Sequence, residues 1–297
     1  MLYDVIIIGR GPAGLSAAIY TVRAGLKTLV LGMTEVGTLT KPYHIENYFG
    51  FEEPILSIDL LKNGEAQAKR LGAEIIDAQV TGVDMYANLI VKTTGQNYEG
   101  KAVLLATGQG RKNAGIPGEE LFEGKGISYC AVCDGFFYKD RPVVVVGNGE
   151  YALAEAEELK NMASKVSILT NGKPLLFEAE GIDVYTEKIQ KIESESSTMG
   201  NVSITGVTLE NGSFIEANGM FVAVGTASAT DFARKLGIEF EGTDIKVARN
   251  CETNFPGIFA AGDCIGGFKQ IATAVGEGAN ASRGIIEYCR KNPGGSN

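Results

Sequence analysis

The sequence contains no tryptophan, a single histidine and no long apolar run. His44 alone cannot build a histidine-rich metal site, and Ser-His-Asp or Cys-His catalysis would depend wholly on that one residue. No window approaches the roughly 18 uninterrupted apolar residues of a membrane span. No signal peptide precedes the first apolar run, Val5 to Ile8, so we expect no membrane partner.

Positive charge is also scarce. Lys and Arg number 27 against 36 Asp and Glu, a formal net charge of −9, and no basic tail or polybasic run is present. This balance argues against nucleic acid or an anionic membrane as the main partner. The five cysteines, an odd number, do not make a secreted disulfide framework. We therefore expect a cytoplasmic protein, in which a CxxC pair is catalytic or metal-binding.

Glycine, in contrast, is abundant at 39 of 297 residues, well above the usual share. Two segments repeat one pattern, in which a β-branched run leads through a glycine-rich turn into an alanine-rich stretch. They are Asp4 to Ala18 and Val143 to Ala154. Such runs fit buried parallel strands, each followed by a crossover helix. The two copies predict two nucleotide-binding folds in one chain.

Further elements extend this prediction. Val103 to Gly108 and Gly257 to Asp263 are each typical of a strand that ends in a small-residue turn, and Ile271 to Arg290 is typical of a helix. We expect an α/β fold with two Rossmann-like domains, the second inserted in the first. The expected boundaries are 1–111 with 241–297 for the first domain and 112–240 for the second, with flexible connectors near 109–118 and 225–229.

The first glycine turn, Gly9-x-Gly11-x-x-Gly14, follows a strand and opens a helix. There, backbone amides and the helix N-terminus can hold a pyrophosphate, which predicts a bound dinucleotide. The alternative is a glycine-rich turn with no ligand. The next strand ends in Gly32, where such a fold carries an acidic partner for the ribose. Glu35 is the nearest candidate for that role.

Cys130-Ala131-Val132-Cys133-Asp134 is the sharpest local signal. Two thiols at this spacing can close a small-ring disulfide, and the adjoining carboxyl can move protons during exchange. Zinc is the rival interpretation, but the chain has no second CxxC and no histidine pair to complete the ligands, so we expect no metal. An inert pair is a third alternative. The remaining cysteines are interpreted as small buried apolar residues: Cys251, Cys264 and Cys289.

Five motifs occur together along the chain. They are the first glycine turn, Glu46-Asn47-Tyr48-Phe49-Gly50, Ala106-Thr107-Gly108, the run from Gly126 to Tyr138 around the CxxC, and Ala261-Gly262-Asp263. In this order, and over nearly the whole chain, they resemble the low-molecular-weight thioredoxin reductases. The resemblance implies a homodimeric flavoprotein with FAD in the first domain and the dithiol on the inserted NAD(P)H-type domain. Electrons would pass from flavin to disulfide to thioredoxin.

By position, the resemblance gives each site residue a role. Cys133 would face the isoalloxazine, Cys130 would exchange with thioredoxin, and Asp134 would act as acid and base. A helix cap is the alternative for Asp134. The residues implied at the FAD pyrophosphate are Gly9, Gly11, Pro12 and Ala13. The other implied cofactor contacts, with Asp263 on the ribityl chain, are Glu35, Thr40, Asn47, Thr107, Gly108, Gly262, Asp263, Gln270 and Ile271.

The second glycine turn departs from this family. The family reads the 2′-phosphate of NADPH with a His-Arg-Arg cluster after the next strand, whereas Lys173 is the one cation in Thr170 to Pro174. No acid stands there to select NADH. Glu150 would compete with a phosphate for the helix amides, and the ring of Tyr151 would fill pyrophosphate space. The helical stretch expected after the cluster is also largely missing.

These departures resemble the ferredoxin-dependent flavin thioredoxin reductases, which keep the architecture but have a degenerate nucleotide loop. Val36-Gly37-Thr38 also stands where the NADPH enzymes carry Gly-Gly-Gln. We therefore expect ferredoxin as the electron donor. Three alternatives stay open: NAD(P)H bound through other residues, a second flavin stacked on Tyr151, and a flavin-bound redox sensor without turnover.

An acidic ferredoxin would need local basic groups on a chain of net negative charge. Neighbouring cations can supply them, although such pairs are also common on a solvated face. The candidate pairs are Arg111 with Lys112, Lys139 with Arg141, and Arg234 with Lys235.

Overall fold

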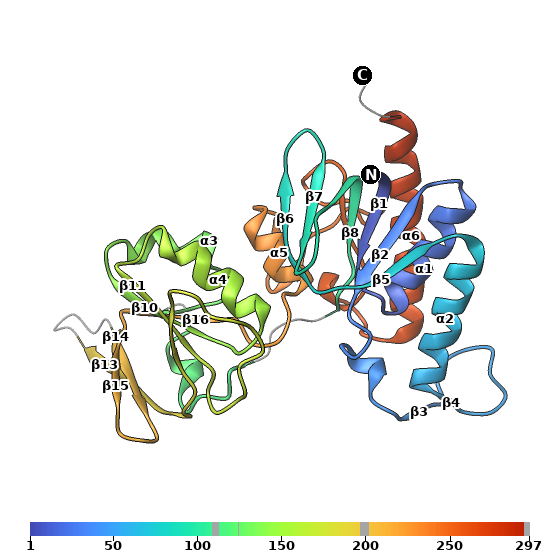
Figure 1. Cartoon of the computed structure of the whole chain (residues 1–297). Coiled ribbons are helices and arrows are strands. Elements are labelled where there is room, and N and C mark those ends of the chain that lie inside the picture. The colour runs from blue at the N-terminus through green and yellow to red at the C-terminus, as the bar shows by residue number, and fades with distance from the viewer. Residues whose placement is uncertain (109–112, 124, 197–201, 294–297) are drawn as a thin grey trace. The chain divides into compact units, whose positions relative to one another are not determined.

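The structure is a computed structural model that describes residues 1–108, 113–123, 125–196 and 202–293. It divides into two compact units (Figure 1): unit 1 contains residues 1–110 and 228–297, and unit 2 contains residues 111–227. The chain therefore leaves unit 1 once and returns to it. Each unit has its own apolar core and is described by itself.

The chain returns to unit 1 earlier than expected from the sequence. Residues 228–240, expected in the inserted domain, lie in unit 1. The physical reason is α5 (Ala229–Lys235), which contacts β18 (Asp244–Ile245) of the same unit. A capping box between Ser228 and Asp231 starts this helix. The expected connector at 109–118 lies partly outside the described residues.

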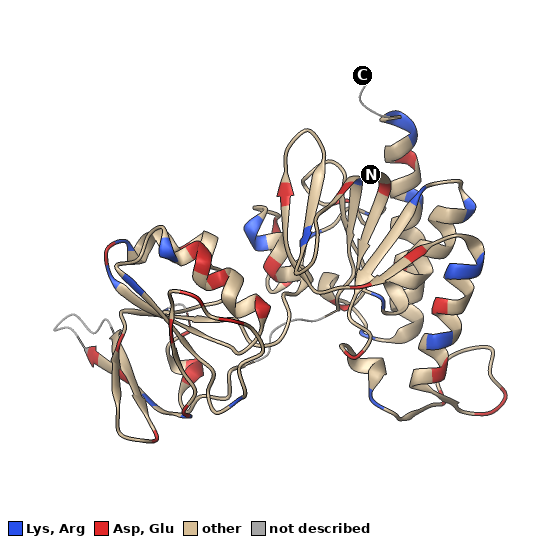
Figure 2. Ribbon diagram, viewed as in Figure 1, with Lys and Arg blue, Asp and Glu red and all other residues tan. Residues whose placement is uncertain are grey.

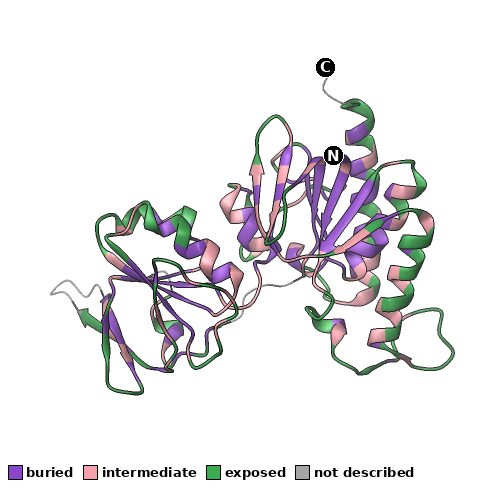
Figure 3. Ribbon diagram, viewed as in Figure 1, coloured by how far each residue is buried: buried purple, intermediate pink, exposed green. Residues whose placement is uncertain are grey.

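Unit 1 is built on a seven-stranded sheet with the order β5-β2-β1-β8-β7-β6, and β19 also pairs with β8. The strands from β5 to β8 and β19 are parallel, whereas β7 and β6 are antiparallel. Val5 to Ile8 are buried (Figure 3), as expected of a β-branched run inside a parallel sheet. The bounds are β1 Leu2–Ile8, β2 Thr28–Gly32, β5 Glu74–Asp77, β6 Val80–Met85, β7 Leu89–Thr93, β8 Tyr98–Leu105 and β19 Ile258–Ala260.

Helix α1 (Pro12–Arg23) contacts both α2 (Ser57–Leu71) and α6 (Ile271–Lys291) in unit 1 (Figure 1). Pro12 suits the first helical position because its fixed φ is already helical. In the described part of the chain, no helix combines the length and the apolar character needed to cross a bilayer. The short ladders of unit 1 are β3 (His44–Ile45) with β4 (Ile55–Leu56), and β17 (Phe240–Glu241) with β18.

Unit 2 contains a parallel sheet with the order β12-β11-β10-β16-β9 and an antiparallel sheet β13-β14-β15. Its central strand β10 is a run of valines that is buried after its first residue. The bounds are β9 Ile127–Ser128, α3 Ala131–Asp134, β10 Pro142–Val146, α4 Glu150–Lys160, β11 Lys165–Leu169, β12 Asp183–Tyr185, β13 Ile189–Ser196, β14 Val202–Leu209, β15 Phe214–Glu216 and β16 Gly219–Val222.

The two units repeat one arrangement around their glycine turns. In unit 1, the Gly9 amide donates to the Leu31 carbonyl of the adjacent strand at 2.8 Å. In unit 2, the Gly147 amide donates to the Leu169 carbonyl at 3.0 Å. The strand order β2-β1-β8 of unit 1 has its counterpart in β11-β10-β16 of unit 2. The predicted α/β fold with two Rossmann-like units is confirmed.

Helices α1 and α6 lie so close together that one position on α6 requires glycine. A Cβ on Gly278 would lie 2.1 Å from the carbonyl oxygen of Ala13, whereas a Cβ on Gly276 would meet nothing within 4 Å. We expect Gly278→Ala to lower the free energy of unfolding by about 1–3 kcal/mol, because the helices must move apart. Gly276→Ala, the matched control, should raise it by about 0.5–1 kcal/mol. Urea unfolding compares the two variants, and equal midpoints would contradict this expectation.

Candidate active site

Close contacts determine the shape of the first glycine turn. Gly9 has a φ of 120°, and a Cβ on it would lie 2.2 Å from the carbonyl oxygen of Ala106. A Cβ on Gly14 would lie 2.0 Å from the Gly9 carbonyl oxygen. Both positions therefore require glycine if the turn keeps this shape. The turn places the start of α1 beside the ends of β1 and β8.

The middle glycine of this turn faces open space. A Cβ on Gly11 would meet nothing within 4 Å, and among the described residues no side chain caps α1. The first turn of the helix contains Pro12 and Ala13 and no acidic residue. An uncapped helix N-terminus presents backbone amides and the positive end of the helix dipole, which is the arrangement that binds a pyrophosphate. The residues expected at the pyrophosphate therefore form an open cradle.

Several residues expected on the flavin side come together from distant parts of unit 1. Asn47 Nδ2 donates to Gln270 Oε1 at 3.0 Å, although 223 positions separate the two residues. Gln270 is the N-cap of α6, and Ile271 begins the helix. Gly262 lies next to the pyrophosphate cradle, since a Cβ on it would approach the Cβ of Ala13 to 3.1 Å.

Thr107 and Gly108 follow β8, at the edge of the sheet where the cradle lies. The Thr107 hydroxyl accepts from the Ala229 amide at 2.5 Å, and Gly108 has a φ of 72°. Asp263 begins the short 3-10 helix η4 (Asp263–Ile265), directly after Gly262.

Glu35 and Thr40 lie on the loop after β2 rather than at the glycine turn. Glu35 is exposed. The Thr40 hydroxyl donates within its own loop, to the Gly37 carbonyl at 2.7 Å and to the Glu35 carbonyl at 3.3 Å. The roles inferred for these two residues from the sequence stay predictions.

Glu277 on α6 is a functional candidate that gives no signal in the sequence. Its carboxylate accepts from the Gly262 amide at 2.8 Å. Burial raises the pKa of Glu277, the hydrogen bond from Gly262 opposes this shift, and the charge of Asp263 adds to it. Glutamates are common in helices, and this partner amide lies 15 positions earlier in the chain. Glu277 links α6 to the loop that carries Asp263.

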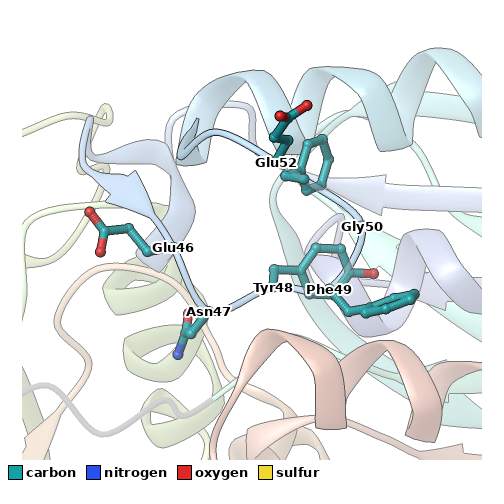
Figure 4. Close-up of a pocket in the computed structure, with 7 residues that line it drawn as sticks. Glu46, Asn47, Tyr48, Phe49, Gly50 and Glu52 are labelled. Carbon is teal, nitrogen blue, oxygen red and sulfur yellow. The ribbon is translucent and has the colours of Figure 1, made fainter.

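A surface hollow with a volume of about 570 Å³ is lined by the loop from Glu46 to Glu52, between β3 and β4 (Figure 4). Phe49 on this loop is 97% exposed. One continuous loop supplies the whole lining, and Asn47 within it is the residue that binds Gln270. The hollow therefore includes Asn47, one of the residues expected on the flavin side.

Unit 2 carries the dithiol at the start of α3. Cys130 and Cys133 form a disulfide, and Cys130 Sγ accepts from the Cys133 amide at 3.2 Å. Cys130 is 3% exposed, whereas Cys133 is exposed. In the oxidised form, Cys133 is therefore the sulfur that an incoming group reaches first. The apolar side chains of Val132, Phe136 and Phe137 are exposed in the same segment.

Asp134 is connected to the dithiol through a hydroxyl. Its Oδ2 accepts from Ser128 Oγ at 2.6 Å, and the same hydroxyl accepts from the Cys130 amide at 3.1 Å. The Asp134 side chain makes no capping bond to the following 3-10 helix η3 (Gly135–Tyr138), and the N-cap of α3 is Cys130. The cap alternative therefore has no support in this geometry, and the acid and base role of Asp134 stays a prediction.

Glu155 on α4 is a second functional candidate that was not identified from the sequence. It is 1% exposed, and its Oε2 accepts from the Ala131 amide at 2.8 Å. Ala131 is the first residue of α3, so a buried carboxylate holds the N-terminus of the dithiol helix. A signal was available, because Glu155 lies four residues from Tyr151 and from Leu159 on the buried face of α4.

The second glycine turn keeps the steric frame of the first one. A Cβ on Gly147 would lie 2.2 Å from the carbonyl oxygen of Ala223. Glu150 is an acidic residue in the first turn of α4, where the first glycine turn has none. Tyr151 is 3% exposed. Its ring is therefore part of the core and offers no stacking surface to a second flavin.

The loop after β11 is tied to the second glycine turn. Asn148 Nδ2 donates to the Pro174 carbonyl at 2.9 Å, and the Leu176 amide donates to the Asn148 carbonyl at 2.9 Å. Residues 170–182, all of them described, contain no helix. The loop expected to carry a basic cluster in an NADPH enzyme thus lies against the turn itself.

Known proteins resemble this chain along nearly its whole length. Residues 3–278 match the family model of the pyridine nucleotide-disulphide oxidoreductases. The chain is 38% identical over 302 residues to a thioredoxin reductase of Streptomyces clavuligerus, which covers 96% of this chain and 93% of that protein. The chain belongs to the thioredoxin reductase family.

Two solved thioredoxin reductases are similar in fold as well as sequence. The atypical thioredoxin reductase TRi from Desulfovibrio vulgaris Hildenborough superposes with a TM-score of 0.88 at 42% identity, covering 97% of this chain and 98% of that one. The ferredoxin-flavin thioredoxin reductase from Clostridium acetobutylicum gives 0.71 at 31% identity, covering 98% and 99%. Thioredoxin reductases of this family are FAD flavoproteins, so FAD is the cofactor that the open cradle of unit 1 fits.

We expect alkylation of the reduced thioredoxin reductase to separate the dithiol from the other cysteines. Burial raises the pKa of Cys251 to about 11, of Cys264 to about 12 and of Cys289 to about 11, so few thiolates form there at about pH 8. Iodoacetamide should modify Cys130 and Cys133, at the start of α3, well before the three buried cysteines. Peptide mass spectrometry over time gives the order. Equal labelling of Cys251 and Cys133 would contradict it.

We expect Glu155→Ala to destabilise the oxidised protein by about 1–3 kcal/mol, because the buried Ala131 amide loses its acceptor. Glu155→Gln keeps an acceptor oxygen and should recover much of the loss. Glu157→Ala, on the same helix, removes only a surface ion pair to Lys160 at 2.8 Å, so a change below about 1 kcal/mol is expected. Urea unfolding of the full chain measures all three, and similar effects at both positions would refute the role of Glu155.

Proposed function

We propose that this chain is an FAD-dependent thioredoxin reductase that receives its electrons from ferredoxin and not from NADPH or NADH. The observation that carries the proposal is the loop after β11, which is hydrogen-bonded to the second glycine turn through Asn148, at Pro174 and Leu176. A pyridine nucleotide needs that turn open for its pyrophosphate. It also needs side chains after β11 that read its ribose or 2′-phosphate.

Further features of unit 2 support this proposal. Lys173 is the one cation in the loop, and the Thr170 hydroxyl donates to its carbonyl at 2.6 Å. Glu150 places a negative charge at the helix N-terminus where a phosphate would bind. The Clostridium acetobutylicum relative is a ferredoxin-flavin thioredoxin reductase, and the Desulfovibrio relative is described as atypical. The family description, which names pyridine nucleotide, favours the alternative donor.

The proposed domains follow the two units: unit 1 holds FAD and unit 2 carries the dithiol. Bound FAD supplies the chemistry of accepting electrons singly and delivering them as a pair. The cradle amides around Gly11 would hold its pyrophosphate, and Asp263 and the Asn47–Gln270 pair would orient the rest. Each thioredoxin disulfide reduced consumes two electrons and two protons, and therefore two molecules of a one-electron ferredoxin.

In the proposed cycle, Cys133 is the thiol that faces the flavin, in agreement with its exposure. After reduction, the thiolate of Cys130 attacks the thioredoxin disulfide and forms a mixed disulfide, and one sulfur of thioredoxin leaves as a thiol. Cys133 then attacks Cys130, which releases reduced thioredoxin and re-forms the protein disulfide. Asp134 accepts and returns the proton. Because Cys130 is 3% exposed when oxidised, α3 must shift on reduction.

The surroundings of the dithiol suit a protein substrate. Val132, Phe136 and Phe137 are 48%, 72% and 71% exposed, so thioredoxin would cover apolar surface when it docks. Lys139 and Arg141, which are exposed in unit 2, are candidate contacts for an acidic ferredoxin. Acidic residues, in contrast, lie along α4 (Figure 2). In unit 1, Arg234 lies 4.7 Å from the Phe240 ring. The pair Arg111 and Lys112 lies outside the described residues.

We also propose a cytoplasmic homodimer. Cys251, Cys264 and Cys289 are free and buried, as suits a reducing compartment. Phe49 in unit 1 is 97% exposed, and a second copy of the chain would remove such apolar surface from water. Sedimentation of the FAD-loaded protein distinguishes a dimer from a monomer.

Anaerobic reduction of the FAD-loaded protein tests the donor. We expect NADPH and NADH to leave the flavin absorbance unchanged, because the loop after β11 lacks a basic cluster and Glu150 stands at the start of α4. Reduced ferredoxin should bleach the flavin and support turnover of thioredoxin. The Cys130→Ser variant is the control, since its flavin should still be reduced while thioredoxin is not. Rapid bleaching of the flavin by NADPH at micromolar concentration would refute the proposal. Bleaching by neither donor would equally refute ferredoxin.

A further inference from the structure

Arg10 lies inside the first glycine turn, between Gly9 and Gly11. Its side chain is 9% exposed, and its Nη1 donates to the Gly32 carbonyl at 3.3 Å and to Thr34 Oγ1 at 2.7 Å. A glycine turn does not need an arginine, because backbone amides hold the pyrophosphate. The buried guanidinium therefore requires its own explanation.

Two carboxylates fix the direction of this guanidinium. Glu65 Oε1, on α2, accepts from Arg10 Nη2 at 2.5 Å and from Nε at 2.8 Å. Asp77 Oδ2, at the end of β5, accepts from Nη1 at 3.4 Å and from the Thr34 amide at 3.2 Å. Such a planar fork is held in one orientation. Within the described residues, Nη2 donates to Glu65 alone, so its second N–H remains for a ligand.

Arg10 occupies the place of the missing ribose acid. A dinucleotide-binding fold carries that acid at the end of its second strand, where the carboxylate accepts from a ribose hydroxyl. Here β2 ends at Gly32, and a Cβ on Gly32 would lie 3.1 Å from Arg10 Cγ and 3.3 Å from Arg10 Cδ. The backbone nitrogen of Arg10 lies 3.2 Å from the same Cβ position. The Arg10 side chain therefore supplies two of the three nearest contacts that a longer side chain at position 32 would meet. Glu35, suggested by the sequence, is exposed on the next loop.

We propose that Arg10 recognises the adenosine half of FAD. Its second Nη2 N–H is donated to a ribose oxygen, so the ribose acts as acceptor here, whereas it is a donor toward a carboxylate. FMN lacks the adenosine half and has no group at this position. The recognition therefore discriminates FAD from FMN. It depends on the FAD site of unit 1 and is independent of the proposed electron donor.

Titration of the apo-protein with FAD and with FMN tests this role, with quenching of flavin fluorescence as the readout and no electron donor present. We expect Arg10→Ser to weaken FAD binding about tenfold, the effect of one charge-assisted hydrogen bond, and to leave FMN binding within about twofold. Arg23→Ser is the matched control, because it removes an exposed arginine at the end of α1. It should change neither affinity.

A second variant restores the usual chemistry. Arg10→Ser combined with Gly32→Glu and Glu65→Gln supplies a carboxylate in the vacated space while removing the unpaired charge of Glu65, and should regain most of the lost FAD affinity. If Arg10→Ser lowers both affinities equally, or neither, Arg10 is only a clamp between α2 and β2 and the proposal is overturned. Should this variant not fold because Glu65 has lost its cation, adding Glu65→Gln removes the stranded charge, and the same two titrations decide.

Discussion

Gly9 and Gly147 each approach the carbonyl at the end of a neighbouring strand so closely that neither position has room for a Cβ. This contact fixes where each turn leaves its sheet, and hence where the next helix begins. The helix N-terminus then lies at the carboxyl edge of the strands, with its amides directed out of the core. In unit 1, the pyrophosphate cradle and the neighbouring Gly262 are located by this one constraint.

The two glycine turns share this close backbone contact but differ in the residues around them. In unit 1, Gly11 is open and the first turn of α1 is free of acidic residues, so the turn can accept an anion. In unit 2, the loop after β11 is hydrogen-bonded to the turn through Asn148, and Glu150 stands at the start of the helix. The two turns share one geometry although their surroundings differ, because each turn is also needed to join strand to helix.

The fold could be predicted because each of its signals is local. A valine or isoleucine run, a glycine turn and the CxxC each occupy only a few consecutive residues. The boundary near residue 240 was misplaced, although Ser228 and Asp231 have the spacing of a helix start. Glu155 and Glu277 were not identified because their partners are backbone amides brought near only by packing. The sequence pattern does not show which side chains are buried. In the structure, Tyr151 is a core residue, and Cys130 is buried whereas Cys133 is exposed.

Unit 1 receives β19 and α6 from the last part of the chain, and these elements pair with β8 and pack on α1. Every strand of unit 2, in contrast, comes from the uninterrupted segment 111–227. During translation, the whole of unit 2 is therefore synthesised before β19 and α6. The redox-active segment can thus mature on the nascent chain, whereas cofactor loading has to wait until β19 and α6 have been made.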